Sequence, residues 1–156
     1  MELKELSLQD RERITALYMD VFTREPWNDD WSCPGQLDAY ITELAGQRNS
    51  LTFGYFDGDR LIGLAMGHIR HWHEGTEYCI DEFCIARDMQ RQGHGGRFLQ
   101  CVENQLLERG IPWIFLLTDR HVPAYEFYLR HGFRELHTNA CMVRKAGAPR
   151  HERKSP

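Results

Sequence analysis

A glycine-rich run joins a predicted strand to a predicted helix in the second half of the chain. The strand-like segment is Tyr78 to Ile85, the run is Gln90-Arg91-Gln92-Gly93-His94-Gly95-Gly96, and an amphipathic helix is expected to begin at Arg97. Glycine lets the backbone approach a ligand closely, and free amides at a helix N-terminus direct a positive dipole at it. The run therefore predicts a site for an anionic group, such as the phosphate of a cofactor. A plain strand-to-helix connection is the alternative.

Residue periodicity predicts strands and helices on both sides of this run. The Asp57-Gly58-Asp59 turn between two apolar runs indicates an antiparallel hairpin, and the fully apolar segment at 113–117 is expected to lie centrally in a sheet. The expected elements are a strand at 1–6, a helix from Ser7 to Phe22, a helix after Ser32 and Pro34, strands at 51–56, 60–68 and 78–85, a helix from Arg97 to Arg109, a strand at 113–117, a helix at 124–131, and two pairing strands at 133–137 and 141–144. This order predicts an α/β fold with a mixed, mostly antiparallel sheet flanked by helices on both faces.

Size and composition limit the classes of protein to consider. With 156 residues and 42% hydrophobic content, one domain over residues 1–145 is expected, followed by a disordered tail at 146–156. No apolar run is long enough to cross a membrane, and five scattered cysteines indicate reduced thiols, so a cytoplasmic protein is expected. The net charge of -4 argues against nucleic acid as a partner and favours a cationic small molecule.

Two motifs stand on either side of a predicted helix and strand. They are Gln90-x-x-Gly93-x-Gly95 and Ala124-x-x-Phe127-Tyr128-x-Arg130-x-Gly132-Phe133. The first resembles the Q/R-x-x-G-x-G/A diphosphate loop of GNAT-superfamily N-acetyltransferases, and the second resembles their A-x-x-L-Y-x-K-x-G-F signature. Members of this superfamily transfer an acetyl group from acetyl-CoA to an amine. The chain departs from the pattern at Arg87, where proline is common, and at His121, where asparagine often begins the second motif.

The resemblance implies a binding site for acetyl-CoA as co-substrate. The amides from Arg91 through Gly96 would cradle the diphosphate, and the backbone of Phe83 to Ile85, splayed by a bulge, would bind the pantetheine arm like an added strand. Arg91 and Arg97 either add positive charge there or are solvated surface residues. The residues expected at this site are Phe83, Cys84, Ile85, Gln90, Arg91, Gln92, Gly93, His94, Gly95, Gly96, Arg97, His121, Tyr125 and Tyr128.

Acetyl transfer needs a base for the amine, polarisation of the thioester carbonyl and an acid for the departing thiolate. Tyr128 is the expected acid, because a phenol with a reference pKa of about 10 is protonated at neutral pH; its alternative role is packing alone. Asp81 and Glu82 are the candidate bases, and on an ideal strand they face opposite sides. A solvated or structural carboxylate pair is the alternative. An amide near Cys84 or Ile85 is expected to polarise the carbonyl.

Acceptor recognition is expected from aromatic and acidic side chains, which together suit a desolvated cation. These lie in the unpatterned segment 25–31, in segment 71–74 and in the acidic pair. The expected acceptor-binding residues are Trp27, Asp29, Trp31, Trp72, Asp81 and Glu82. The alternative for each tryptophan is that it only holds a loop to the core. His68, His71 and His73 are spaced without a nearby cysteine pair, so no metal is expected.

The sequence therefore predicts an N-acetyltransferase that transfers the acetyl group of acetyl-CoA to a primary amine of a small cationic molecule, such as a polyamine or aminoglycoside-like compound. A protein lysine or N-terminal acetyltransferase is one alternative, which Leu116 disfavours because N-terminal acetylating relatives tend to have glutamate there. A non-catalytic acyl-CoA-binding sensor is the other. The expected partner is the small-molecule amine, with no nucleic acid and no membrane, and a homodimer is left open.

Overall fold

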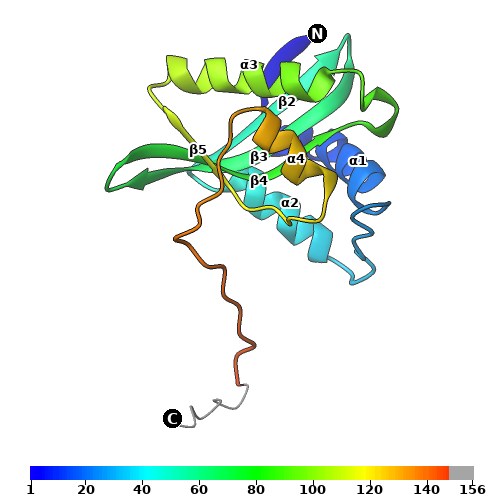
Figure 1. Ribbon diagram of the computed structural model, residues 1–156. Helices are drawn as coiled ribbons and strands as arrows, with labels where there is room; N and C mark the ends of the chain where they lie inside the picture. The colour runs from blue at the N-terminus through cyan, green and yellow to red at the C-terminus, as the bar shows by residue number, and fades with distance from the viewer. Residues whose placement is uncertain (148–156) are drawn as a thin grey trace.

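The computed structural model describes residues 1–147, which contain a five-stranded sheet with helices on both faces (Figure 1). The strand order is β1-β2-β3-β4-β5, and all neighbouring strands are antiparallel except β4 and β5, which are parallel. The elements are β1 (Glu2–Leu6), η1 (Leu8–Asp10), α1 (Arg11–Phe22), α2 (Gln36–Gly46), β2 (Ser50–Asp57), β3 (Arg60–Trp72), β4 (Gly75–Ile85), η2 (Arg87–Met89), α3 (His94–Glu108), β5 (Trp113–Leu116) and α4 (Pro123–Arg130). The predicted mixed, mostly antiparallel α/β fold is confirmed.

Two neighbouring residues of β4 show which helices cover each face of the sheet. Glu82 is hydrogen-bonded to Tyr18 of α1 and Tyr40 of α2, whereas the Phe83 ring stacks on one ring from α3 and one from α4. Adjacent side chains on a strand point to opposite faces. Thus α1 and α2 cover one face, α3 and α4 cover the other, and Figure 1 shows α3 across the sheet from α1 and α2.

Local sequence signals explain where several elements begin and turn. Ser7 and Asp10 form the predicted capping box, but it opens the short helix η1, which runs directly into α1. Gly58 has a positive φ of 57° at the turn between β2 and β3, a conformation that glycine adopts without strain. Among residues 1–147, no helix is long and apolar enough to cross a membrane.

Three expectations differ from the structure. The strands predicted at 133–137 and 141–144 are not formed, and Met142 and Val143 are 88% and 98% exposed. The strand at 113–117 was expected to be central, but β5 lies at a sheet edge because no strand of the described residues covers its outer side. The helix expected from Arg97 begins three residues earlier, at His94. Most of the tail predicted at 146–156 lies outside the described residues, from residue 148 on.

A β-bulge interrupts the pairing of β3 with β4. Met66 pairs with Glu82 and Gly67 pairs with Ile80, so Asp81 is an extra residue on β4. A Cβ atom on Gly67 would lie 2.2 Å from the carbonyl oxygen of Cys79. Only glycine therefore allows this close approach of the two backbones beside the bulge.

Replacing Gly67 by Ala is expected to lower the free energy of unfolding by about 3 kcal/mol, because the contacted atom is backbone and must move. Urea denaturation measures this change. Gly46→Ala is the matched control: its Cβ would meet the flexible end of Leu8, and alanine is favoured in a helix, so a change below about 1 kcal/mol is expected. Equal, small effects in both variants would show that the bulge is not tightly packed.

Candidate active site

Glu82 is the most perturbed carboxyl group of the described residues. Its Oε1 accepts hydrogen bonds from the Tyr40 hydroxyl at 2.5 Å and from the Tyr18 hydroxyl at 3.3 Å. Burial raises the pKa of Glu82 to about 7, the two hydroxyl donors oppose that rise, and the negative charges of Asp29 and Asp81 add to it. A carboxyl group that titrates near neutral pH can accept a proton under physiological conditions.

Glu82 opens into a pocket of about 440 Å³, which we call the Glu82 pocket. The Trp31 ring stacks on the Tyr40 ring with centroids 5.2 Å apart, and Tyr18 meets Trp31 edge-on. The pocket combines three carboxyl groups with three aromatic rings, a composition that suits a cation. Its lining residues are Tyr18, Asp29, Asp30, Trp31, Gln36, Tyr40 and Glu82.

Asp81 and Glu82 lie on the same face of the sheet, so the expectation of opposite faces is wrong. The bulge breaks the alternation of side chains, and the Asp81 carboxylate contacts His68 Nδ1 at 2.9 Å. Asp81 lines a separate pocket of about 330 Å³ together with residues of α2 such as Glu43 and Leu44. The structure therefore brings both carboxyl groups to the α1 and α2 side but gives them different surroundings.

Tyr128 lies on α4 and is 8% exposed. Its ring packs against Phe83 and Phe133, with centroids 6.4 Å and 5.2 Å away. Its hydroxyl makes no hydrogen bond with any residue from 1 to 147. Burial first, and then the nearby Glu82 and Cys84, raise the pKa of Tyr128 well above its ordinary value, so the phenol stays protonated at neutral pH.

The N-terminus of α3 has no side-chain cap and no acidic residue in its first turn. Arg91 and Gly93 have positive φ values of 57° and 78°, which turn the chain into the helix. The Arg97 guanidinium reaches back to donate to the Gln92 carbonyl at 3.0 Å, beside the positive end of its own helix. Free amides and a cation thus meet at one point with no anion among the described residues there.

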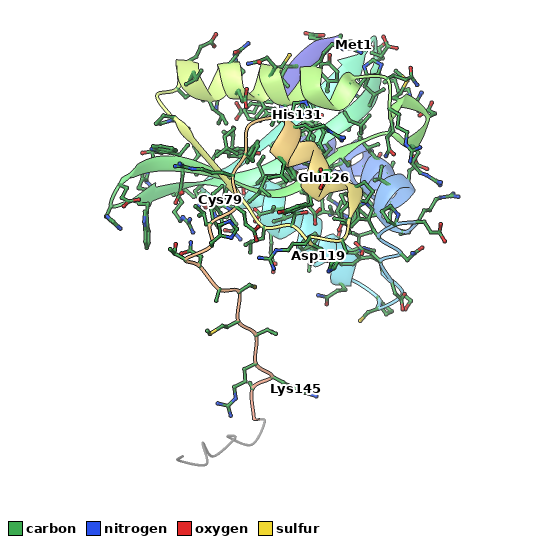
Figure 2. The ribbon with its side chains drawn as sticks, viewed as in Figure 1. Met1, Cys79, Asp119, Glu126, His131 and Lys145 are labelled. Carbon is green, nitrogen blue, oxygen red and sulfur yellow. The ribbon has the colours of Figure 1, made fainter. Side chains whose placement is uncertain are left out.

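Two glycines of the run also serve the contact between α3 and α4. A Cβ on Gly95 would lie 3.1 Å from the Phe127 ring, and a Cβ on Gly96 would lie 2.6 Å from His131 Nε2. Figure 2 shows His131 at the end of α4 near α3. A side chain at Gly96 would clash with His131 and one at Gly95 would crowd Phe127, so both glycines also allow the close packing of α3 and α4.

Beyond its first residues, β4 has a free edge. β5 pairs with Glu77 to Ile80, and no other strand within residues 1–147 covers the rest of β4 on that side. Ala86 donates its N–H to Ile62 of β3, and because paired residues alternate along an antiparallel ladder, the backbone groups of Phe83 and Ile85 point away from β3. The Ile85 carbonyl accepts a hydrogen bond from the Gln90 side chain at 2.9 Å. The Phe83 N–H and C=O and the Ile85 N–H remain directed at the open side.

Several sequence-predicted residues are not at the Glu82 pocket. Trp72 is 54% exposed at the far end of β3, about 20 Å along the strand from Met66, which pairs with Glu82. Trp27 packs on Phe22, with ring centroids 5.7 Å apart, and does not line the pocket.

The segment before and within α4 carries the remaining predicted contacts. The Tyr125 hydroxyl donates to Glu135 at 3.1 Å, and Arg120 pairs with the same carboxylate, so the two anchor the chain that follows α4. His121 is exposed.

The histidines of β3 do not form a metal site. His71 Nδ1 lies 3.0 Å from the Thr76 hydroxyl, and no group of three or more His, Cys, Asp or Glu among residues 1–147 could hold a metal ion.

Sequence reasoning missed the two phenols that contact Glu82. Tyr18 recurs at helical spacing with Ile14, and Tyr40 recurs at helical spacing with Leu44, so the spacing indicates only buried helix faces at these positions. The available signal was their hydroxyl groups, because a buried tyrosine hydroxyl requires a hydrogen-bond partner.

Comparisons with known proteins identify the family and the fold. The model of the acetyltransferase (GNAT) family matches residues 11–133. Three solved structures share the fold. An aminoglycoside acetyltransferase from an uncultured soil metagenomic sample has a TM-score of 0.68 and 17% sequence identity, and the match covers 92% of this chain and 96% of that one. AAC(6')-Iy with a bisubstrate analog has a TM-score of 0.71 and 14% identity, with 92% and 97% of the two chains covered; a ribosomal-protein-alanine N-acetyltransferase from Brucella melitensis biovar Abortus 2308 has a TM-score of 0.71 and 15% identity, with 93% and 100% covered. A comparison with curated proteins finds no significant match.

Proposed function

The chain belongs to the acetyltransferase (GNAT) family, whose members depend on acetyl-CoA, and from this premise we propose that it acetylates a primary amine of a small cationic molecule. The proposed catalytic unit is a single domain over residues 1–145. The acetyl group passes directly from the thioester to the amine, without an acetylated enzyme residue. The observation that carries the proposal is the Glu82 pocket, where a carboxyl group with a pKa of about 7 lies among aromatic rings and two further acids.

Acetyl-CoA supplies the activated acetyl group, and the chain has groups that fit it. The amides of His94, Gly95 and Gly96 bind the diphosphate, and Arg97 adds a cation at the same point. The free edge of β4 at Phe83 and Ile85 hydrogen-bonds the pantetheine arm as an added strand would. The Ile85 N–H is also available to polarise the thioester carbonyl, whereas the Cys84 N–H faces β3.

Glu82 and Tyr128 divide the proton transfers between them. Glu82 takes a proton from the acceptor ammonium, directly or through one water, and the neutral amine then attacks the carbonyl carbon. As the carbon–nitrogen bond forms and the carbon–sulfur bond breaks, Tyr128 donates its proton to the departing thiolate. The attacking nitrogen then releases its second proton to solvent, which leaves a neutral amide, and Tyr128 regains a proton from solvent. Both groups titrate in the required order, because burial raises the pKa of Glu82 to about 7 and that of Tyr128 far higher.

The shape and charge of the pocket favour a small polycationic acceptor. Asp29 and Asp30 lie beside Glu82, so one ammonium can meet Glu82 while a second meets the two aspartates. Two of the solved structures that share the fold support this choice through their ligands or names, an aminoglycoside acetyltransferase and AAC(6')-Iy with a CoA–acetylneamine analog.

A thiol-release assay tests the acceptor class. Purified protein and acetyl-CoA are incubated with polyamines, aminoglycosides, amino acids and peptides, and free coenzyme A is measured. We expect the largest kcat/KM for acceptors with two or more amino groups, lowered at least tenfold by Asp29→Asn with Asp30→Asn, because the second ammonium loses its partners. Asp59→Asn, on the hairpin turn, is the matched control.

The alternatives make different predictions in the same assay. Release with peptides alone would overturn the small-amine proposal and support a protein acetyltransferase; one structure of the same fold is a ribosomal-protein-alanine N-acetyltransferase. Binding of acetyl-CoA without release for any acceptor would support a sensor.

A further inference from the structure

The hydroxyl groups of Tyr40 and Tyr18 both donate hydrogen bonds to the Glu82 carboxyl group. We propose that Tyr40 is a positioning residue that fixes Glu82 through its Oε1, with Tyr18 as a weaker second support, so that Oε2 is left to accept the proton of the amine. The inference rests on the proposed function of Glu82 as the base. It adds residues from two helices that are distant from β4 in sequence.

The distances separate the two phenols. Tyr40 donates to Glu82 Oε1 at 2.5 Å, which is the length of a strong hydrogen bond to a carboxylate, whereas Tyr18 donates to the same oxygen at 3.3 Å. No residue from 1 to 147 donates to Oε2. Because both donors share one oxygen, the carboxylate cannot rotate without losing both bonds, and its second oxygen keeps a constant direction.

Packing holds the Tyr40 ring in place. It stacks on Trp31 with an interplanar angle of 30° and meets Tyr18 edge-on, with centroids 6.0 Å apart. These rings come from α1, α2 and the segment between the two helices. The position of the Glu82 carboxylate therefore depends on the docking of both helices onto the sheet.

Titratable groups from several elements surround Glu82 and act on its ionisation. The phenol donors favour its ionised form, since a hydrogen bond to a carboxylate stabilises the charge, while burial and nearby acids oppose ionisation. The titratable groups that face it are Tyr18 from α1, Tyr40 from α2, Asp29 and Asp30 from the segment between them, Asp81 and Cys84 from β4, and Tyr128 from α4. Removal of the Tyr40 hydroxyl should raise the pKa of Glu82 above its present value.

The test compares the pH dependence of kcat/KM for wild type, Tyr40→Phe and Tyr18→Phe with one acceptor, whose own titration cancels in the ratio. We expect Tyr40→Phe to lower kcat/KM about tenfold at pH 7, which is the effect of one charge-assisted hydrogen bond. The inflection of the pH profile should move to higher pH, so kcat/KM should fall less at pH 9. Tyr18→Phe should lower kcat/KM less than Tyr40→Phe does, because its hydrogen bond to Glu82 is longer. Tyr55→Phe, which removes a hydroxyl from a ring stacked on Phe98, should match wild type.

A loss that is the same at every pH, with an unmoved inflection, would show that Tyr40 is only structural and overturn the inference. So would full activity of Tyr40→Phe. Carbon-13 NMR titration of the Glu82 carboxyl in both proteins gives a readout that does not require turnover. If wild type transfers no acetyl group, the proposed function fails, but a Glu82 titration that moves upward in Tyr40→Phe still supports the hydrogen-bond assignment and an unmoved one refutes it.

Discussion

Replacing Glu82 by Gln is expected to lower kcat/KM for acetyl transfer by about 100- to 10,000-fold at pH 8, the range that a positioned general base contributes. Gln keeps the size of the side chain and can still accept from Tyr40, but its amide cannot take a proton from the amine. In wild type, kcat/KM should rise with pH through about 7, because Glu82 is ionised and active only above its pKa. That rise should be absent in Glu82→Gln.

Two comparisons make this result specific. Glu77→Gln changes another β4 glutamate, which pairs with Arg70 rather than with the pocket, and should leave the pH profile unchanged. Asp81→Asn should lower kcat/KM less than Glu82→Gln does, because Asp81 faces His68 and a different pocket. A larger loss for Asp81→Asn would move the role of base from Glu82 to Asp81.

The same substitution has a signature in stability. The folded state raises the pKa of Glu82 from 4.5 to about 7, so the folded protein binds the proton more tightly than the unfolded chain does. The contribution of this group to the free energy of unfolding is therefore fully present below pH 4.5 and is lost as pH rises to 7. Thermal unfolding at pH 5 and pH 8 should show less loss of stability with pH in Glu82→Gln than in wild type.

Replacing Tyr128 by Phe is expected to lower kcat at least tenfold while acetyl-CoA binding is retained. Phenylalanine keeps the packing on Phe83 and Phe133, and the removed hydroxyl has no hydrogen-bond partner among the described residues, so the fold should be unaffected. Without the phenol, the thiolate departs without a proton donor. Steady-state kinetics give kcat, and calorimetry gives the dissociation constant of acetyl-CoA.

Tyr55→Phe serves as the control for loss of a phenol elsewhere, since its ring is buried against Phe98. Unchanged turnover in Tyr128→Phe would remove Tyr128 from the mechanism. A variant with weakened acetyl-CoA binding and unchanged kcat would instead assign the hydroxyl to binding.

The sequence predicted those parts of the fold that depend on local physics. Helical spacing, the Ser7 capping box and the Asp57-Gly58 turn each depend on residues close together in the chain, and all three are confirmed. The side-chain direction of Asp81 was not predictable, because a one-residue bulge reverses the alternation of a strand and depends on the close approach at Gly67. The strands predicted near the C-terminus have suitable residues, but a strand forms only where a partner pairs with it.

In the candidate site too, the features that depend on nearby residues were predictable, whereas those that depend on tertiary packing were not. Motif spacing singled out the glycine run and Tyr128. The structure places the glycine run at the N-terminus of α3, the acidic pair in β4, and Tyr128 on α4 against Phe83 of β4. The Glu82 pocket was only half predicted, since Tyr18 and Tyr40 become its neighbours through helix docking over long sequence separations. Periodicity identifies a buried helix face but not the group on which that face packs.

The most direct test of the central claim is a crystal structure of the protein with coenzyme A. We predict that the diphosphate lies at the amides of His94 to Gly96 and the pantetheine arm along the free edge of β4. The sulfur should lie within hydrogen-bond reach of the Tyr128 hydroxyl, on the side where Glu82 opens. Coenzyme A bound elsewhere, or a sulfur remote from Tyr128, would contradict it.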